Sequence, residues 1–237
     1  MLNAFKNPGA VALIGAGSDI GQAIVRHLDT SATQQLRLVS RSGDVTPPIE
    51  GGSPIQIAGD FASSEGRARI VESIFANGDL DVAIIAIGVL QGELSEILNI
   101  NYTASVELLS AIADRMVVQR HGSILVISSF AAVRPRPGIF QYGSAKAGLD
   151  FFARGLAESV KGAGVKISVL RPGFVHTKMT KGLTAAPFSI DVEKAGACGA
   201  KTLESKKVVS YAPGILRLVA SILIHLPQVI FNKISAE

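Results

Sequence analysis

A tyrosine and a lysine four residues apart are the side chains in this sequence best suited to proton chemistry. Tyr142 and Lys146 fall one turn apart on a predicted helix and share a face, and Ser129 ends an apolar run upstream of them. A nearby ammonium favours the phenolate and lowers the tyrosine pKa from about 10, which suits proton transfer to a ketone oxygen. The serine hydroxyl would hold that oxygen in place. In isolation, such a pair is more often part of an exposed helix turn. The surrounding sequence therefore decides whether this pair is interpreted as catalytic.

A glycine-rich stretch near the N-terminus is a candidate nucleotide-binding loop. The segment "ALIGAGSDIGQAIVRHL" (12–28) predicts a buried strand, a turn and a helix. Gly15 and Gly17 permit a tight turn and close backbone approach, and Gly21 permits close packing of the helix on the strand. The helix beginning near Asp19 would point free N–H groups at a bound anion. The spacing G-x-G-x-x-x-G misses the G-x-G-x-x-G fingerprint, so a purely structural turn stays an alternative.

The order of elements along the chain predicts where these residues lie. Short apolar runs predict strands at 10–15, 36–40, 54–59, 81–88, 122–129, 165–173 and 207–213, and longer patterns predict helices at 19–29, 63–77, 94–119 and 141–162. Runs this apolar suit strands that are covered on both faces. We therefore expect one Rossmann-type domain over 1–237, with a doubly wound parallel sheet of about seven strands flanked by helices. Residues 178–206 are interpreted as a lid between the last two strands.

Composition narrows the class of protein. Hydrophobic residues make up 48% and charged residues 18%, which indicates a globular chain rather than a disordered one. A net charge of +4 without a basic block argues against nucleic acid as a partner. The lone cysteine, Cys198, excludes an internal disulfide, and no paired Cys/His cluster suggests a metal. The first residues lack the layout of a signal peptide, so we expect a cytoplasmic protein.

Taken together, these motifs resemble the short-chain dehydrogenase/reductase family over nearly the whole chain. The family's catalytic serine and Tyr-x-x-x-Lys pattern map onto Ser129, Tyr142 and Lys146, and its helix asparagine maps onto Asn101 in "NINYTASVELL". The resemblance implies an NAD(P)-dependent oxidoreductase acting on CH–OH and C=O groups, and a homo-oligomer. It also implies that Lys146 holds the nicotinamide ribose and that Asn101 supports a water relaying protons to Lys146.

The sequence departs from the family pattern in two places. The segment "AIG" at 86–88 stands where the family usually has Asn-Ala-Gly, so the hydrogen bonds of that asparagine are in doubt. The opening loop follows the family's G-x-x-x-G-x-G at Gly15 and Gly21, but Asp19 replaces the middle glycine. A carboxylate facing a pyrophosphate is unfavourable, so we expect Asp19 to turn into the first turn of its helix, where a negative charge is favoured.

The resemblance also implies a set of dinucleotide-binding residues. They are Gly15, Gly17, Ser18, Asp19, Ile20, Gly21, Arg41, Asp60, Phe61, Gly88, Tyr142, Lys146, Pro172, Gly173, Val175 and Thr177. The second predicted strand ends at Ser40, without the acid that would accept ribose hydroxyls, and Arg41 can pair with a 2′-phosphate. We therefore favour NADP over NAD, with a solvated Arg41 as the alternative. Asp60 either contacts the adenine or caps the following helix.

Several segments resemble one subgroup of the family, the decaprenylphosphoryl-2-keto-ribose reductases of mycobacterial and corynebacterial arabinan synthesis. These are "GAGSDIG", "DLDVAIIAIG", "INYTA", "YGSAKAGLD", "RPGFVHTKM" and "YAPGILRLVASILIHLP". The resemblance implies reduction of decaprenylphosphoryl-2-keto-erythro-pentose to decaprenylphosphoryl-arabinose for the cell wall, beside a flavin-dependent oxidase partner. Arg134 or Arg136 would meet the lipid-linked phosphate, with a solvated loop charge as the alternative. Reduction of another lipid, steroid or acyl ketone stays the alternative function.

The C-terminal tail, 213–237, is strongly apolar. Arg217, Pro227 and Asn232 interrupt it, so the pattern does not predict a membrane-spanning helix. Apolar residues at helical spacing are Ile215, Leu218, Ile222 and Leu226. Three interpretations stay open, namely packing on the core, a homo-oligomer contact, and peripheral contact with a membrane near a lipid substrate.

Overall fold

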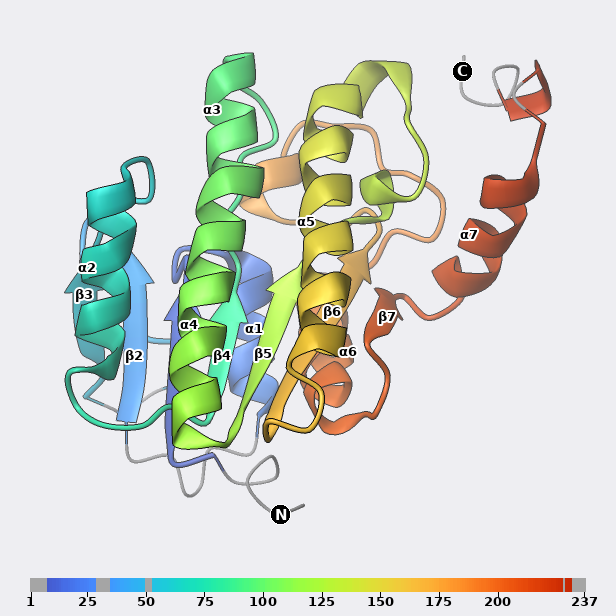
Figure 1. Cartoon of the computed structure of the whole chain (residues 1–237). Helices are drawn as coiled ribbons and strands as arrows, with labels where there is room; N and C mark the ends of the chain where they lie inside the picture. The colour runs from blue at the N-terminus through green and yellow to red at the C-terminus, as the bar shows by residue number, and fades with distance from the viewer. Residues whose placement is uncertain (1–7, 29–34, 50–52, 228, 232–237) are drawn as a thin grey trace.

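Seven parallel strands form one sheet in the order β3-β2-β1-β4-β5-β6-β7 (Figure 1). A computed structural model describes residues 8–28, 35–49, 53–227 and 229–231. The strands are β1 Ala10–Ile14, β2 Gln35–Ser40, β3 Ile55–Ala58, β4 Val82–Ile85, β5 Gly122–Ile127, β6 Val165–Pro172 and β7 Val209–Ala212. Helices α2, α4 and α5 cover one face of the sheet, and α1 and α6 cover the other (Figure 1). The predicted doubly wound α/β fold is confirmed.

The helices also follow the sequence pattern closely. They are α1 Asp19–His27, α2 Ser64–Phe75, α3 Leu94–Leu98, α4 Ser105–Gln119, α5 Phe140–Ser159, α6 Val192–Glu204 and α7 Leu216–His225. The predicted helix at 94–119 is present, with a π-helical turn at Asn99–Ala104 between α3 and α4. Residues 1–7, 29–34, 50–52, 228 and 232–237 of the predicted domain lie outside the described residues. They include residue 29 of the first predicted helix and Asn232 of the tail.

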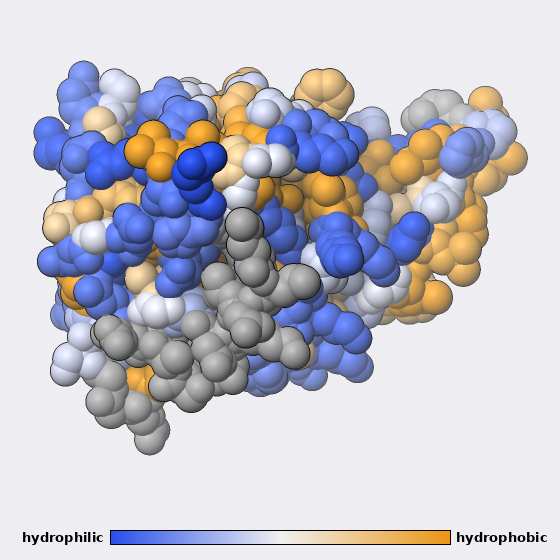
Figure 2. Space-filling view, turned by 60° about the horizontal axis from the view of Figure 1, so that its bottom comes forward, coloured by the Kyte–Doolittle hydropathy of each residue, from blue (hydrophilic) through white to orange (hydrophobic). Residues whose placement is uncertain are grey.

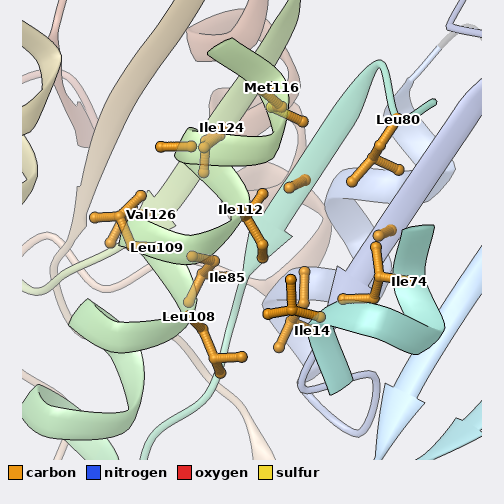
Figure 3. Close-up of a cluster of buried hydrophobic side chains, with 14 of the residues drawn as sticks. Ile14, Ile74, Leu80, Ile85, Leu108, Leu109, Ile112, Met116, Ile124 and Val126 are labelled. Atoms are coloured by element: carbon orange, nitrogen blue, oxygen red, sulfur yellow. The ribbon is translucent and has the colours of Figure 1, made fainter. Parts of the chain in front are cut away.

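The apolar strands pack on both faces because helices cover both faces. Successive side chains of a strand point to opposite sides, so Leu13 and Ile14 of β1 join different clusters. Ile14 packs with Ile85 of β4 and Leu108 of α4 (Figure 3). This cluster lies on the face of the sheet that α2, α4 and α5 cover. Burial on two sides gives these strands continuous apolar runs rather than an alternating pattern.

The topology opens a crevice beside the carboxyl end of β1. Its neighbours are β2 on one side and β4 on the other, and the chain winds in opposite directions from there. Ligands of doubly wound sheets bind at such a switch point. The loops after β1, β2 and β4 therefore meet at one edge, together with the start of α1.

The lid predicted over 178–206 is wrong for its second half. Residues 192–204 form α6, whose buried face packs tightly on α1. A Cβ added at Gly196 would lie 2.6 Å from the Cβ of Ala23, so glycine is required for this approach. A run rich in glycine and alanine resembles a loop in sequence, yet here its small side chains let two helices pack closely. The lid hypothesis narrows to 178–191.

The tail forms α7, but its apolar stripe faces outward. Leu216 and Ala220 are buried, whereas Ile215, Leu218 and Ile222 are 47%, 60% and 57% exposed. Figure 2 shows hydrophobic side chains gathered at the end of the molecule that α7 occupies. Core packing therefore does not explain these three residues. Within the described residues, no helix is both long and apolar enough to cross a membrane.

Candidate active site

Ser129 and Tyr142 meet where β5 ends and α5 begins. Ser129 follows β5 and accepts a hydrogen bond from the backbone N–H of Ala131 (3.1 Å), which fixes its hydroxyl. Tyr142 lies in the first turn of α5 and is half-buried. Desolvation raises the pKa of Tyr142 to about 12, and hydrogen bonding with Ser129 acts in the opposite direction. The phenol is therefore protonated at neutral pH.

Lys146 lies one turn further along α5 and is almost fully buried. Its ammonium donates to the carbonyl oxygens of Ile87 (3.2 Å) and Ile127 (3.1 Å). Burial lowers the pKa of Lys146 to about 8. The Nζ atom lies 5.9 Å from the centre of the Tyr142 ring. The expected lowering of the tyrosine pKa by this lysine is wrong: desolvation of the phenol raises that pKa, and the group that acts to lower it is Ser129.

Asn101 is buried in the π-helical turn between α3 and α4. Its side-chain amide donates to the carbonyl oxygens of Val89 (2.8 Å) and Ile97 (2.9 Å), and its carbonyl oxygen accepts from the Val89 N–H (3.2 Å). A π-helical turn inserts an extra residue and re-aims side chains, often at functional sites. Asn101 thus holds the segment after β4, where the family's usual asparagine is missing. The relay water stays a prediction.

A cavity of about 800 Å³ opens at the switch point next to these residues. Ten of the predicted dinucleotide residues line it, namely Gly15, Gly17, Ser18, Asp19, Ile20, Arg41, Asp60, Phe61, Gly88 and Thr177. Sequence reasoning missed other lining residues, which include Ser42, Ser95, Asn99, Lys178 and Met179. The segment from Lys178 was readable as part of the site, because it directly follows Thr177. The residues on α3 carried no comparable signal.

The glycines of the opening loop test whether a dinucleotide fits this cavity. A Cβ added at Gly15 would lie 2.9 Å from the Ala86 and Ile87 backbone, and one at Gly21 would lie 2.8 Å from Leu13. Both glycines are thus explained by the protein's own packing. At Gly17, an added Cβ would meet no protein atom within 4 Å. Gly17 lines the cavity, so we expect its lack of a side chain to allow close approach of a pyrophosphate.

Replacing Gly17 with alanine is expected to separate ligand binding from folding. The variant should keep its free energy of unfolding within about 1 kcal/mol, because Gly-to-Ala changes without strain are small effects. A methyl group facing the pyrophosphate should weaken dinucleotide binding at least about tenfold, which is roughly 1.4 kcal/mol. Urea unfolding and fluorescence titration with the reduced dinucleotide measure the two effects. Gly155→Ala on α5, where the added Cβ also meets no atom within 4 Å, is the matched control. Unchanged affinity in Gly17→Ala contradicts this placement.

The end of β2 and the loop after β3 complete the far side of the cavity. Ser40, Arg41 and Ser42 line it, and Ser40 accepts a hydrogen bond from the Gly43 N–H (3.0 Å). Asp60 accepts from the Ala62 N–H (2.8 Å) and from the Ser63 hydroxyl (2.6 Å), which lowers the pKa of its carboxyl. Asp60 therefore both braces the turn before α2 and lines the cavity. Adenine contact stays a prediction.

Asp19 stands in the first turn of α1, as expected, and its carboxylate has a partner that the sequence did not reveal. It accepts a hydrogen bond from the Lys178 backbone N–H (2.8 Å) and lies 3.1 Å from the Lys178 ammonium. The same ammonium donates to the Gly17 carbonyl oxygen. The charge that would repel a pyrophosphate is thus neutralised by a cation on the cavity wall. This contact also ties the segment after β6 to the opening loop.

Asp19→Asn is expected to weaken dinucleotide binding rather than strengthen it, because the lost ion pair no longer ties the segment after β6 to the opening loop. The change removes the ion pair with Lys178, and it leaves an uncharged oxygen to accept from the backbone N–H. Because exposed pairs contribute about 0.2–1 kcal/mol, the dissociation constant should rise up to about fivefold. Lys178→Met removes the same pair from the other side and should have a similar or larger effect. A tightening of binding in Asp19→Asn would mean that the carboxylate faces the phosphates after all.

The predicted dinucleotide residues at and after the end of β6 have different surroundings. Gly173 donates to the Ala212 carbonyl oxygen (2.8 Å), and a Cβ there would clash with Leu216 of α7 at 2.5 Å. Val175 is buried and pairs with Ile190 in an isolated parallel bridge. Thr177 is the first of these residues to reach the cavity wall. Pro172, Gly173 and Val175 therefore shape the loop. The predicted dinucleotide residues that are not in the cavity lining are these three together with Gly21, Tyr142 and Lys146.

Arg134 and Arg136, expected near the substrate, have different surroundings. The Arg134 guanidinium donates to the carbonyl oxygens of Leu223 and Leu226 (2.6 Å to the latter), and it lies 4.2 Å from the centre of the Phe231 ring. Arg134 thus binds the end of α7. Arg136 is half-buried, desolvation lowers its pKa, and no carboxylate of the described residues lies within 4 Å of it. The two arginines are not equivalent candidates for a phosphate.

Comparison with known proteins decides the family. The model of the short chain dehydrogenase family matches residues 9–187. The chain belongs to this family. An uncharacterized oxidoreductase of Mycobacterium tuberculosis is 34% identical over 238 residues, covering 94% of this chain and 96% of the relative. The 3-oxoacyl-[acyl-carrier-protein] reductase of Escherichia coli is 28% identical over 199 residues, covering 74% and 78%.

Solved structures agree with this assignment at the level of the fold. A short chain dehydrogenase from Burkholderia cenocepacia in complex with NADP superposes with a TM-score of 0.80 at 18% identity, covering 95% of this chain and 97% of that one. A 3-oxoacyl-[acyl-carrier protein] reductase from Brucella melitensis in complex with NAD gives 0.77 at 22% identity, covering 90% and 98%. The protein is an NAD(P)-dependent oxidoreductase of the short-chain family.

The geometry of a short-chain reductase assigns a task to each side chain. A reduced nicotinamide supplies the hydride when bound. Tyr142, protonated at neutral pH, can donate its proton to a ketone oxygen, and the fixed Ser129 hydroxyl can hydrogen-bond the same oxygen. The Lys146 ammonium donates to two main-chain carbonyl oxygens, and these bonds hold the cation beneath the phenol. Asn101 holds the segment after β4, which lines the cavity at Gly88 and Val89.

Proposed function

We propose that this protein uses NADPH to reduce the 2-keto group of a lipid-linked keto-pentose, decaprenylphosphoryl-2-keto-erythro-pentose, to decaprenylphosphoryl-arabinose. The observation that carries the reduction is the meeting of Ser129, a protonated Tyr142 and a buried Lys146 beside the dinucleotide cavity. A flavin-dependent oxidase would supply the ketone, and arabinan of the cell wall would consume the product. The segments shared with that subgroup of reductases support this substrate.

The preference for NADP rests on the end of β2. Ser40, Arg41 and Ser42 line the cavity there, and this short stretch contains no carboxylate to accept ribose hydroxyls. A guanidinium binds a phosphate through two parallel hydrogen bonds. Arg41 is exposed and free to turn toward a 2′-phosphate, which supports NADPH as the hydride donor.

Arg136 supports an anionic substrate. It lies between Ser129 and Tyr142 on the segment expected to face the substrate, and burial of its charge lowers its pKa. A partly desolvated cation without a carboxylate partner gains from a bound anion. Arg134 is engaged by α7, so we assign the polyprenyl phosphate to Arg136 rather than to Arg134.

Arg136→Gln is expected to raise KM for the lipid-linked ketone at least about tenfold, because one charge-assisted hydrogen bond contributes about 1.5–3 kcal/mol. The kcat should change little, and KM for a small uncharged ketone should stay the same. Steady-state kinetics on both substrates measure the split. Arg120→Gln, which removes an exposed arginine at the other end of the sheet, is the control. An equal loss on both substrates would remove Arg136 from phosphate recognition.

A second candidate function is reduction of a 3-oxoacyl group, which the Escherichia coli relative at 28% identity favours. The deciding experiment measures kcat/KM with NADPH and with NADH on decaprenylphosphoryl-2-keto-pentose, on a 3-oxoacyl thioester and on a small cyclic ketone. We expect the lipid-linked pentose to be preferred by at least about a hundredfold, as binding of the whole substrate is used at the reacting centre. A higher kcat/KM on the thioester would replace the proposal with the acyl function.

The proposal leaves two uses for the exposed stripe of α7, formed by Ile215, Leu218 and Ile222. One is contact with a second copy of the chain in a homo-oligomer. The other is peripheral contact with the membrane that holds the lipid substrate, in a cytoplasmic enzyme. Light scattering tests for contact with a second copy, and vesicle sedimentation tests for contact with a membrane.

A further inference from the structure

A second cavity, of about 460 Å³, lies between α5 and α7 and away from the dinucleotide site. Its walls come from α5, β6, the turn before β7, β7 itself and α7. It shares no lining residue with the dinucleotide cavity. Among the described residues that line it are four cations and no carboxylate, with the cations being Arg154, Arg171, Lys207 and Arg217.

Part of this cationic cluster is explained by the fold. Asp150 of α5 is buried and accepts two hydrogen bonds from Arg171, at 2.7 Å from Nε and 2.6 Å from Nη2. It also accepts from Nε of Arg154 (2.9 Å). Arg171 donates further to the Tyr211 hydroxyl (2.5 Å). This network fastens α5 to β6 and β7, but one carboxylate faces two guanidinium groups, so a positive charge is left over.

Lys207 and Arg217 are not explained by the fold. Both are exposed, and no carboxylate of the described residues lies within 4 Å of either ammonium or guanidinium group. Both nevertheless line the same cavity as Arg154 and Arg171. With Asp150 counted against the four cations, the cluster keeps three positive charges. Cations that converge without an anion repel each other, and a bound anion removes this repulsion.

The other wall residues define the rest of the ligand. Tyr211 and Ser221 carry hydroxyl groups at the cavity, and Val209, Ala220 and Ile224 add an apolar side. The volume suits a small organic molecule rather than a single ion. Guanidinium groups in such a cluster match the geometry of a phosphate.

We propose that this basic cavity binds a phosphate-bearing ligand, with the phosphate between the four cations and a short apolar part on Val209, Ala220 and Ile224. The ligand is either a soluble phosphate monoester or the headgroup of a phospholipid, because the two share this chemistry. This cavity is separate from the site of the reduction proposed above, and the two proposals are tested independently. Arg171 directly precedes Pro172, so the ligand would bind at the base of the loop that leads to Thr177.

The test removes the two cations that the fold does not use. Inorganic phosphate is titrated by calorimetry into the full chain saturated with NADP(H), which keeps phosphate out of the dinucleotide cavity. We expect one phosphate per chain in the parent protein. The double variant Lys207→Gln/Arg217→Gln should bind phosphate more than about tenfold less tightly, because two charge-assisted contacts are lost. Lys161→Gln/Lys201→Gln, which removes two exposed lysines elsewhere, is the matched control and should bind as the parent does.

A second arm separates the two sources of phosphate. Sedimentation with vesicles of phosphatidylcholine, with and without phosphatidylglycerol, is run on the same proteins. Pelleting only with the anionic vesicles, lost in the double variant, assigns a phospholipid headgroup. Phosphate binding without pelleting assigns a soluble phosphate. Phosphate binding that is absent in the parent, or equal in the double variant and the parent, overturns the proposal. A change in oligomeric mass alone overturns it too, because the cations then serve an interface between copies.

Discussion

Tyr142→Phe is expected to lower kcat for ketone reduction by about 10²–10⁴-fold, which is the usual contribution of a general acid. The phenyl ring fills the same space at the start of α5, so the free energy of unfolding and the affinity for NADP(H) should stay close to those of the parent. The loss should appear in kcat and in kcat/KM together, because the proton is transferred only in the transition state. Stopped-flow absorbance of the reduced dinucleotide under single-turnover conditions measures it.

Tyr102→Phe is the matched control for this variant. Tyr102 sits in the π-helical turn, 38% of its surface is exposed, and its ring packs against Gly148 of α5. Removing its hydroxyl should leave kcat unchanged. Turnover near the parent level in Tyr142→Phe would exclude Tyr142 as the proton donor and with it the proposed mechanism.

The raised pKa of Tyr142 affects the pH dependence of ketone reduction. With a pKa of about 12 in the protein alone, the phenol keeps its proton across the physiological range. Ketone reduction needs that protonated form, whereas alcohol oxidation needs the phenolate. In kcat/KM for ketone reduction, which reports the free enzyme, ionisation of Tyr142 should therefore produce no falling limb below about pH 10.

The strands and the positions of Ser129, Tyr142 and Lys146 were predictable because their signals are local. Runs such as "AVALI" in β1 are apolar at every position, which only a strand covered on both faces requires. Ser129, Tyr142 and Lys146 follow a spacing that one helix and one strand end produce. The same holds for Gly15 and Gly21, since each meets its neighbours across a short turn.

What the sequence did not predict depends on contacts between distant segments. The partner of Asp19 is Lys178, which follows β6, and the partner of Arg134 is the end of α7. Neither pair has a spacing that marks it. The pKa of Tyr142 was predicted in the wrong direction because it depends on how much solvent the folded chain removes. The tail showed helical spacing, but which face of α7 is buried follows only from where Leu216 meets Gly173.

Lys146→Met is expected to change activity and stability in opposite directions. Loss of the ammonium beneath Tyr142 should lower kcat at least about a hundredfold, because the lysine supports the proton donor and is expected to hold the nicotinamide ribose. Stability should rise at neutral pH. Folding buries a charge whose pKa falls from 10.5 to about 8, and this shift corresponds to roughly 3 kcal/mol. Methionine has a similar length and carries no charge to desolvate.

The sign of the pH dependence follows from proton binding. Between pH 8 and 10.5 the unfolded chain keeps the Lys146 proton while the folded protein has lost it, so the parent gains stability as pH rises through this window. Below pH 8 both states are protonated and the full penalty of burial remains. The stability advantage of Lys146→Met should therefore be roughly 2–3 kcal/mol larger at pH 7 than at pH 10. Tyr142, whose pKa is raised, affects stability only above about pH 10 and does not disturb this comparison.

Urea unfolding at pH 7, 8, 9 and 10 measures this difference, with Lys161→Met as the control. Lys161 is exposed and pairs with Glu158, so its variant should show a constant offset from the parent across the series. If Lys146→Met instead loses stability equally at pH 7 and pH 10, the hydrogen bonds to Ile87 and Ile127 outweigh the desolvation of the ammonium. Lys146 would then stabilise the fold as well as the transition state. If the advantage at pH 7 is found together with the loss of turnover, the chain keeps a buried cation that weakens its fold because catalysis requires it.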